Sequence, residues 1–380
     1  MTRLPAIGIT CYPTQGGSGI IASELGLNLA RSGYEVHFIT SAMPLRLQRY
    51  EGNIFYHQVE MATYPVFQNT PYTLSLATMM SQVALRHNLD ILHVHYAIPH
   101  AASGFLAREM VGADRLKLIT TLHGTDITLV GQEPSFFPIT KFLIERSDAV
   151  TAVSQFLRRE TVKVFGIQRP IEVIPNFVDT RRFHPREDPK QRARFAAPDE
   201  KLVGHASNFR PVKNVPAVVE VFSRLSAAVP CRLVLLGDGP EKCRVQDQVD
   251  ALGLTDRVQF LGQVENMAEV MALADLVLLP SLHESFGLVA LEAMSCGCAV
   301  IATNNGGTEE FIDSGHNGYL CAPEDIDGMT KIGLNLLKDD TLRQQVAEEA
   351  RRDAVEKFGA RCVLKDYLQL YDRVMDGAGA

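Results

Sequence analysis

The sequence predicts an α/β protein built from two Rossmann-like, doubly wound domains that face each other across a cleft. Its 380 residues are more than twice the about 150 that one domain usually occupies. Short apolar strands alternate with helical segments, which is typical of parallel strands joined by crossover helices. This alternation restarts near residue 180, after a stretch rich in proline, arginine and aspartate. A single, very large domain is the competing interpretation.

The first half begins with an apolar strand at residues 6–10, followed by a glycine-rich loop. Apolar residues then recur at helical spacing between Ile20 and Leu29, and Ser32-Gly33 is a natural helix end. Four further strands, each followed by a polar loop, are predicted at residues 36–39, 91–94, 118–122 and 149–153.

The second half follows a predicted linker. Prolines and charges without periodicity extend from residue 174 to residue 200. We therefore expect an N-terminal domain at residues 1–178 and a C-terminal domain at residues 179–357. A last helix, at residues 358–375, either stays in the second domain or crosses back onto the first. Strands of the second half are predicted at residues 202–204, 232–236, 258–261, 276–279 and 299–302.

The composition excludes several classes of protein. Hydrophobic residues make up 46% and charged residues 21%, values that exclude a disordered or fibrous chain. The net charge of -7 argues against nucleic acid as the main partner, although a local basic cleft stays open. No apolar stretch reaches the about 18 residues needed to cross a membrane, and no signal peptide is evident. The seven cysteines form no CxxC pair, which favours reduced, mostly buried thiols in a cytoplasmic protein.

Ligands of open parallel sheets bind at the carboxyl ends of the strands, so the loops after the strands are the candidate sites. The first such loop contains Gly17 and Ser18 and opens a helix, whose exposed amides attract anions. The dinucleotide fingerprint GxGxxG is absent and no acid ends the second strand, which argues against NAD. An anionic small molecule is therefore expected, and a tight turn without a ligand is the alternative.

The most informative loop covers residues 280–287 and precedes an apolar helix. Glu284 lies in this loop, and Glu292 follows eight residues later on the helix. A carboxylate one or two turns into a helix is well placed to bind a ribose, and a solvated helix face is the alternative. The apolar neighbours of Glu292 favour partial burial. Three amides at the helix N-terminus are expected to hold a phosphate, those of Phe286, Gly287 and Leu288.

Cations follow the first strand of the second half. Asn208, Arg210 and Lys213 lie in one loop, where Arg210 offers bidentate contacts and Lys213 a point charge to a diphosphate. A solvated charged loop is the alternative. Gly239 lies in the turn after the next strand, where either close approach to a nucleotide or a plain turn explains it.

Histidines are prominent in the first half. His93 and His95 alternate along one strand and so share a face, and Tyr96 follows them. A core histidine with satisfied hydrogen bonds is the favoured interpretation of His93. His123 ends another strand before a glycine, which favours a functional role. No HExxH motif and no carboxylate cluster is present, so we predict neither a structural nor a catalytic metal.

Together these residues carry a family resemblance. The order Arg210, Lys213, the turn at residues 237–240, and Glu284-Ser-Phe-Gly with Glu292 resembles the retaining family 4 glycosyltransferases of the GT-B fold. The Glu-x7-Glu spacing in this context is fairly specific, and the loop glycines are not. In the first half, the motifs GITCYPT, GGSG, HVHYAIPH and TTLHGTD resemble the N-acetylglucosaminyl malate synthases that begin bacillithiol biosynthesis.

The resemblance implies substrates and roles. UDP-N-acetylglucosamine would be the donor and the hydroxyl of L-malate the acceptor, without a metal or other cofactor and without nucleic-acid or membrane partners; homo-oligomerisation stays open. Arg210 and Lys213 would offset the charge of the leaving UDP, and Glu292 would bind its ribose. Gly17, Asn208 and Gly239 would also contact the donor. Glu284 and His123 would contact the donor sugar. The acceptor would contact Ser18, Tyr96, Thr121 and Arg146. For Arg146, a surface cation at a helix end is the alternative.

No close pair of carboxylates is evident for a double displacement. The resemblance implies front-face substitution, in which catalysis rests on positioning and on stabilisation of the UDP charge. Three alternatives stay open: a transferase of the same fold with an inositol phosphate, lipid or glycan acceptor, a UDP-sugar epimerase or hydrolase, and a non-catalytic nucleotide-sugar binding module.

Overall fold

The computed structural model describes residues 3–14, 16–47, 51–61 and 71–377. The chain divides into two compact units. Unit 1 contains Met1–Asn176 together with Ala360–Ala380, and unit 2 contains Phe177–Gly359. Each unit is an α/β domain with one parallel sheet, which confirms the predicted fold class.

Unit 1 is built on a seven-stranded parallel sheet of order β3-β2-β1-β4-β5-β6-β7. The order reverses between β1 and β4, as in a doubly wound fold. The strands predicted from the sequence are confirmed. Two strands were not predicted, the partly exposed edge strand β3 and the two-residue β7, because neither is a continuous apolar run. The strands are β1 (Ile7–Thr10), β2 (Val36–Thr40), β3 (Ile54–Gln58), β4 (Ile91–His95), β5 (Lys117–Leu122), β6 (Ala149–Ala152) and β7 (Glu172–Val173).

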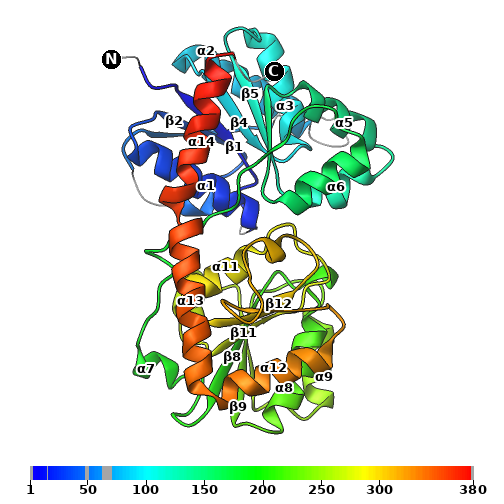
Figure 1. The fold of residues 1–380 in the computed structure, drawn as a ribbon. Coiled ribbons are helices and arrows are strands. Elements are labelled where there is room, and N and C mark those ends of the chain that lie inside the picture. The colour runs from blue at the N-terminus through cyan, green and yellow to red at the C-terminus, as the bar shows by residue number, and fades with distance from the viewer. Residues whose placement is uncertain (1–2, 15, 48–50, 62–70, 378–380) are drawn as a thin grey trace. The chain divides into compact units, whose positions relative to one another are not determined.

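Helices cover both faces of this sheet (Figure 1). One face buries Ile39, Leu92 and Val94 against apolar residues of α2 and α3. On the other side, α1 packs against α14. The helices of unit 1 are α1 (Gly17–Arg31), α2 (Tyr72–His87), α3 (His100–Val111), α4 (Thr125–Thr128), α5 (Phe137–Arg146), α6 (Gln155–Phe165) and α14 (Ala360–Met375), with 3-10 turns at Leu45–Leu47 and Val130–Gln132.

The last helix belongs to unit 1, although it follows unit 2 in the sequence. The apolar residues that gave α14 its helical spacing are buried, and Tyr367 and Tyr371 are fully so. The Tyr371 hydroxyl makes a 2.8 Å hydrogen bond with Nδ1 of His93 on β4. Burial of this one apolar stripe therefore decides which unit the helix joins.

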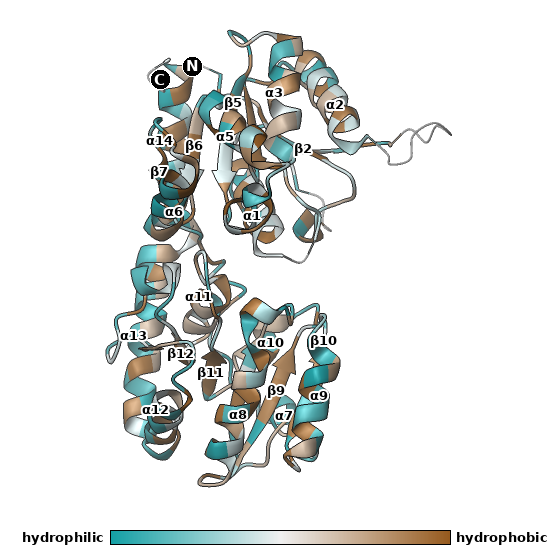
Figure 2. Cartoon of the chain, turned by 90° about the vertical axis from the view of Figure 1, so that its right-hand side faces the viewer, coloured by the Kyte–Doolittle hydropathy of each residue, from teal (hydrophilic) through white to brown (hydrophobic). Residues whose placement is uncertain are grey.

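Unit 2 repeats the doubly wound arrangement with a six-stranded parallel sheet of order β10-β9-β8-β11-β12-β13. Figure 2 shows β9 and β11 in the brown of apolar residues, whereas the outer helix α9 is largely teal. Apolar residues of α8, α9 and α12 pack on one face of the sheet. The strands are β8 (Lys201–Ala206), β9 (Cys231–Leu236), β10 (Val258–Gly262), β11 (Leu276–Leu279), β12 (Ala299–Thr303) and β13 (Tyr319–Cys321), and the helices are α7 (Pro189–Arg192), α8 (Val215–Ser226), α9 (Lys242–Ala251), α10 (Met267–Met271), α11 (Leu288–Ser295), α12 (Ile326–Lys338) and α13 (Asp340–Phe358), with 3-10 turns at Pro211–Lys213 and Gly307–Glu310.

The segment predicted as a linker is instead packed onto unit 2. Phe177 and Phe183 are buried, and the carbonyl of Phe183 accepts hydrogen bonds from Ser295 and Arg351. Arg192 donates to the carboxylate of Asp275, with a distance of 2.7 Å. Several of the charges that suggested a linker thus bind carbonyl and carboxylate groups of unit 2.

All seven cysteines lie in the described part of the chain and none forms a disulfide. Five are buried, among them Cys11 and Cys298, and burial raises the pKa of the Cys11 thiol to about 12. These thiols therefore remain protonated at neutral pH. Within the described residues, no helix combines the length and the apolar character needed to span a bilayer.

Candidate functional site

The strand order of unit 2 brings together two loops that carry the predicted cations and acids. Its order reverses between β8 and β11, and ligands of doubly wound sheets bind where this happens. The loop after β8 contains Val212, and the loop after β11 contains Leu282. The backbone amide of Leu282 donates to the carbonyl of Val212 at 2.8 Å, so the two loops are joined directly.

An ion pair stands at this junction. Lys213 Nζ lies 2.6 Å from Glu284 Oε1, and the hydroxyl of Ser281 donates to the same carboxylate oxygen at 2.8 Å. The side chains of Lys213 and Glu284 are 23% and 18% exposed, so both remain within reach of a ligand. The structure thus brings together two predicted site residues that are 71 positions apart.

Arg210 and Asn208 are exposed in the same loop. The guanidinium of Arg210 has no hydrogen-bond or ion-pair partner among the described residues. The loop therefore offers one cation held by a carboxylate, Lys213, and one that is free to pair with an anion. This combination suits a diphosphate, because Arg210 can bind it without giving up a protein contact.

Glycines let the backbones of neighbouring loops approach each other in this region. A Cβ on Gly239 would stand 2.0 Å from the carbonyl oxygen of Asn208, and Gly239 has φ +158°. This close approach explains why the turn needs glycine at position 239 even without a ligand. The contact of Gly239 with a nucleotide stays a prediction. Gly306 holds the Glu284 loop in the same way, since its Cβ would stand 1.9 Å from the Glu284 carbonyl oxygen.

Helix α11 begins directly after this loop, with Gly287 in a left-handed conformation at its N-cap. The first amides of a helix have no partner inside it, so the amide of Leu288 is available at this end. The side chain of Phe286 is buried and stacks on Phe311 at a centroid distance of 5.1 Å. Only the backbone of Phe286 is therefore suited to the predicted phosphate contact.

Glu292 lies on α11 and is only 3% exposed. The expectation of burial is confirmed, and the alternative of a solvated helix face is wrong. Burial of a carboxylate costs desolvation free energy, so a hydrogen-bonding or charge partner must compensate it. Its contact with a ribose stays a prediction.

His205 was missed by the sequence analysis. This buried histidine lies near the end of β8, where its ring bonds the Leu278 carbonyl at 2.8 Å and the Ser207 hydroxyl at 2.9 Å. Burial lowers its pKa to about 4, and the nearby Lys213 acts in the same direction. His205 is thus a buried, neutral residue close enough to Lys213 and Glu284 to feel their charges. Its place near a strand end is the sequence signal that could have found it.

In unit 1, His93 is a core histidine, as favoured from the sequence. Its Nε2 makes a 2.7 Å hydrogen bond with the hydroxyl of Thr121, which in turn bonds the hydroxyl of Thr151 at 2.7 Å. Thr121 is fully buried. The predicted acceptor contact of Thr121 is therefore corrected, because its hydroxyl is enclosed and committed to two internal hydrogen bonds.

His123 lies at the carboxyl end of β5, beside the end of β4. Its Nε2 is 2.8 Å from Nδ1 of His95, and its ring stacks on Tyr96 at a centroid distance of 5.5 Å. The Nε2 atom of His95 is buried without a partner among the described residues. Tyr96 has φ +92°, a strained conformation for a bulky residue and a frequent mark of a functional site. The structure thus brings His123 and Tyr96 together.

Asp126 is a second residue that sequence reasoning left without a role. Its buried carboxylate accepts hydrogen bonds from the backbone amides of Ala97, His123 and Gly124, at 2.9, 3.2 and 2.8 Å. Burial raises the pKa of Asp126, and these amides act in the opposite direction. One carboxylate therefore ties the loop after β4 to the loop after β5.

The first turn of α1 lies close to the backbone of residues that precede the helix. A Cβ on Gly19 would stand 2.4 Å from the carbonyl oxygen of Tyr12, so the turn needs glycine there. Gly17 is exposed, whereas Ser18 is 9% exposed. Close backbone packing thus explains Gly19. The ligand contacts of Gly17 and Ser18 stay predictions.

The predicted acceptor role of Arg146 is corrected. Arg146 is the last residue of α5 and precedes β6, which places it at the amino edge of the sheet, opposite the loop of His123. Its exposed guanidinium lies 5.4 Å from the ring centroid of Phe142. A helix that follows a strand returns to the amino edge, so the alternative of a surface cation is the one the structure supports.

Comparisons with known proteins agree with this geometry. Residues 15–182 match the family model described as Glycosyltransferase Family 4, and residues 187–353 match the model described as Glycosyl transferases group 1. The chain is 46% identical over 370 residues to the N-acetyl-alpha-D-glucosaminyl L-malate synthase of Bacillus anthracis, covering 97% of both chains. This chain belongs to the family 4 glycosyltransferases.

More distant relatives share the fold of this glycosyltransferase. The D-inositol 3-phosphate glycosyltransferase of Stackebrandtia nassauensis is 28% identical over 88% of this chain and 82% of its own. The crystal structure of Anabaena HepE with UDP and glucose superposes with a TM-score of 0.82 at 21% identity, covering 97% of this chain and 100% of the other. The fold of this glycosyltransferase is therefore GT-B.

We expect the glycosyltransferase to lose stability in mild acid. Burial lowers the pKa of His93 and His123 to about 3, lowers that of His100 to about 4, and takes that of His95 well below 6.5. Below pH 6.5 these histidines stay neutral in the folded state and gain protons only on unfolding. The free energy of unfolding should therefore fall as the pH falls, by up to about 1.4 kcal/mol per pH unit for each histidine.

Urea unfolding at pH 7.5 and pH 5.0 tests this expectation. The variant His316→Gln is the control, because it removes an exposed histidine and leaves the buried ones in place. A free energy of unfolding that stays constant or rises toward pH 5.0 would contradict the account of these buried imidazoles.

Proposed function

We propose that this glycosyltransferase moves N-acetylglucosamine from UDP-N-acetylglucosamine to the hydroxyl of L-malate, with retention at the anomeric carbon. The proposal rests first on the Lys213 and Glu284 ion pair beside the free Arg210 at the switch point of unit 2. It also rests on the 46% identity, over nearly the whole chain, to a relative named for this reaction. As the first step of bacillithiol biosynthesis, the reaction would take place in the cytoplasm.

The donor would bind to unit 2 through its diphosphate. Arg210 would pair with the phosphates, and Lys213 would move part of its interaction from Glu284 to the leaving phosphate as negative charge develops there. The amides of Gly287 and Leu288 would add dipoles of the same sign. Because these groups stabilise the charge of the departing UDP more than that of the bound donor, they would lower the barrier.

The acceptor would bind to unit 1. L-malate is a dianion at neutral pH, so its site needs several hydrogen-bond donors. With Arg146 on the opposite edge, the candidates are the first amides of α1 and the hydroxyls of Ser18 and Tyr96. His123 would contact the donor sugar, and the buried His95 would support it through the bond between its Nδ1 and Nε2 of His123.

We infer a front-face substitution for the chemical step. The bond between the anomeric carbon and the UDP oxygen breaks while the malate hydroxyl oxygen bonds the same face of that carbon. The hydroxyl proton passes to the departing phosphate oxygen, so the products are UDP and the α-linked glycoside. Retention then needs no carboxylate nucleophile, and catalysis depends on orientation of the two substrates.

Incubation of the purified protein with UDP-N-acetylglucosamine and L-malate tests the proposal. We expect release of UDP that depends on malate and a product with the mass of the sugar-malate adduct and an α linkage. Succinate is the matched control, since it keeps both carboxylates and lacks the hydroxyl, and it should release no UDP above background. UDP release that is equal with and without malate would contradict the transfer and indicate hydrolysis, and formation of a second UDP-sugar would indicate epimerisation.

A further inference from the structure

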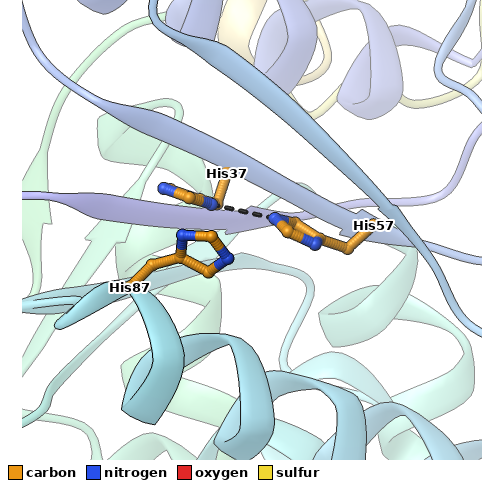
Figure 3. A group of neighbouring side chains, drawn as sticks. All are labelled: His37, His57 and His87. Atoms are coloured by element: carbon orange, nitrogen blue, oxygen red, sulfur yellow. Dashed lines mark hydrogen bonds between the residues drawn. The ribbon is translucent and has the colours of Figure 1, made fainter.

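Three histidines from separate parts of unit 1 meet at the outer edge of its sheet. His37 lies on β2, His57 on β3 and His87 at the end of α2, and one ring nitrogen of each lies within 4.8 Å of the others (Figure 3). No motif spacing links them, so their proximity cannot be predicted from the sequence. Imidazole clusters of this size are a common form of metal site in proteins.

Strand register explains why these side chains converge. His37 pairs with Phe55 and Ile39 pairs with His57 in the parallel ladder between β2 and β3. Side chains alternate along a strand, so these four residues share one face of the sheet. Ile39 packs against apolar residues of α2 on that face, and α2 ends there with His87.

The hydrogen bonds orient the rings for coordination. Nε2 of His37 is 2.8 Å from the Oε1 atom of Glu35, which leaves Nδ1 directed at Nε2 of His57, also at 2.8 Å. A carboxylate on the second ring nitrogen is the usual outer partner of a metal-bound histidine, because it selects the tautomer and makes the ligand nitrogen more basic. Figure 3 shows the His87 ring lying against both of the others.

Burial favours the neutral form of the His37 and His57 rings, which presents nitrogen lone pairs. Burial lowers the pKa of His57 to about 4, and the neighbouring histidines and Arg86 act in the same direction. Burial also lowers the pKa of His37, against the opposing effect of Glu35. A divalent ion placed here would be balanced by Glu35 and by the negative end of the α2 dipole, where His87 is the last residue.

We propose that His37, His57 and His87 bind one divalent transition-metal ion of the zinc class, with solvent as the fourth ligand. Metal–nitrogen distances of about 2.0 to 2.1 Å in a tetrahedral site require ring nitrogens about 3.3 Å apart. The 2.8 Å contact between His37 and His57 would widen by about 0.5 Å as the proton on Nε2 of His57 moves to Nδ1. Imidazole nitrogen suits zinc, cobalt and nickel rather than magnesium or calcium.

This site is separate from the transferase chemistry proposed above. Its ligands lie on β2, β3 and α2, whereas the residues assigned to the acceptor follow β1, β4 and β5. His57 and His87 are only partly buried, so an ion can reach them from solvent. The ion would tie the edge strand β3, which is partly exposed, to its neighbour and to the helix that covers it. The proposal departs from the expectation of no metal, which rested on the absence of an HExxH motif and of a carboxylate cluster.

Titration of the full-length protein with ZnCl2 after chelator dialysis tests the site by calorimetry. We expect one equivalent of zinc per chain. Glu35→Gln should weaken binding by about 10-fold to 100-fold, as for other outer partners of metal ligands, and His57→Gln and His87→Gln should weaken it at least as much. The control is His316→Gln, which removes an exposed histidine of unit 2 and should bind as the wild type does.

A spectroscopic measurement on the wild type keeps the test independent of variant folding. CoCl2 should produce the intense visible absorption of tetrahedral cobalt at one equivalent, and ZnCl2 should remove it. Absence of both the one-to-one zinc isotherm and the cobalt bands would overturn the proposal. So would zinc binding that His57→Gln and His87→Gln leave unchanged, because the ion would then be held elsewhere.

Discussion

Replacement of Lys213 with alanine should lower kcat for glycosyl transfer by about 100-fold or more, the usual cost of removing one donor that stabilises developing negative charge. The reason is local. Lys213 is the cation of the 2.6 Å pair with Glu284, and without it the leaving phosphate would face the Glu284 carboxylate uncompensated. Because Lys213 acts on charge that develops during the reaction, KM for the donor should change far less than kcat.

Steady-state kinetics of Lys213→Ala with the UDP-sugar donor provide the measurement. The matched control is Lys190→Ala, since Lys190 is an exposed lysine of unit 2 on α7. Circular dichroism should show that both variants fold. If Lys213→Ala retained the kcat of the wild type, Lys213 would be a structural partner of Glu284 and would have no part in charge relief.

Replacement of Gly306 with alanine should destabilise unit 2 by about 3 kcal/mol or more, through backbone strain and overpacking together. Gly306 has φ +135° and ψ -147°, a region that only glycine adopts without strain. Its added Cβ would also stand 1.9 Å from the carbonyl oxygen of Glu284. The substitution would therefore displace the Glu284 loop and lower activity as well as stability.

Gly315→Ala separates the two causes. Gly315 also has a positive φ, of +90°, but a Cβ there meets no described atom within 4 Å. It should cost only the strain, about 1 kcal/mol. Urea unfolding of both variants gives the comparison, and equal destabilisation by the two substitutions would show that the contact with Glu284 carries no cost.

Residues on one continuous segment could be assigned from the sequence. Glu284 and Glu292 were placed in a loop and on the following helix because an apolar strand, a glycine and an apolar helix follow in order. The burial of Glu292 also followed from its apolar neighbours. Such local patterns depend only on the periodicity of a few consecutive residues.

Two of the predicted acceptor residues were placed wrongly, each for a topological reason. Arg146 was assigned to the acceptor although the helix after a strand returns to the amino edge of the sheet, a rule that was available from the predicted elements alone. Thr121 was assigned there through the family resemblance, but its hydroxyl is bonded between His93 and Thr151. That environment depends on pairing among three strands and could not be seen in one of them.

The amino-acid sequence determined the alternation of strands and helices, the two sheets, and the loops at which chemistry is expected. These features follow from where apolar side chains recur, because each element must bury one face. Only the tertiary structure showed which loops lie together and that α14 joins unit 1. It also showed that His37, His57 and His87 lie beside one another. Strand order and register bring distant residues together through the packing of whole elements, and no spacing along the chain encodes that.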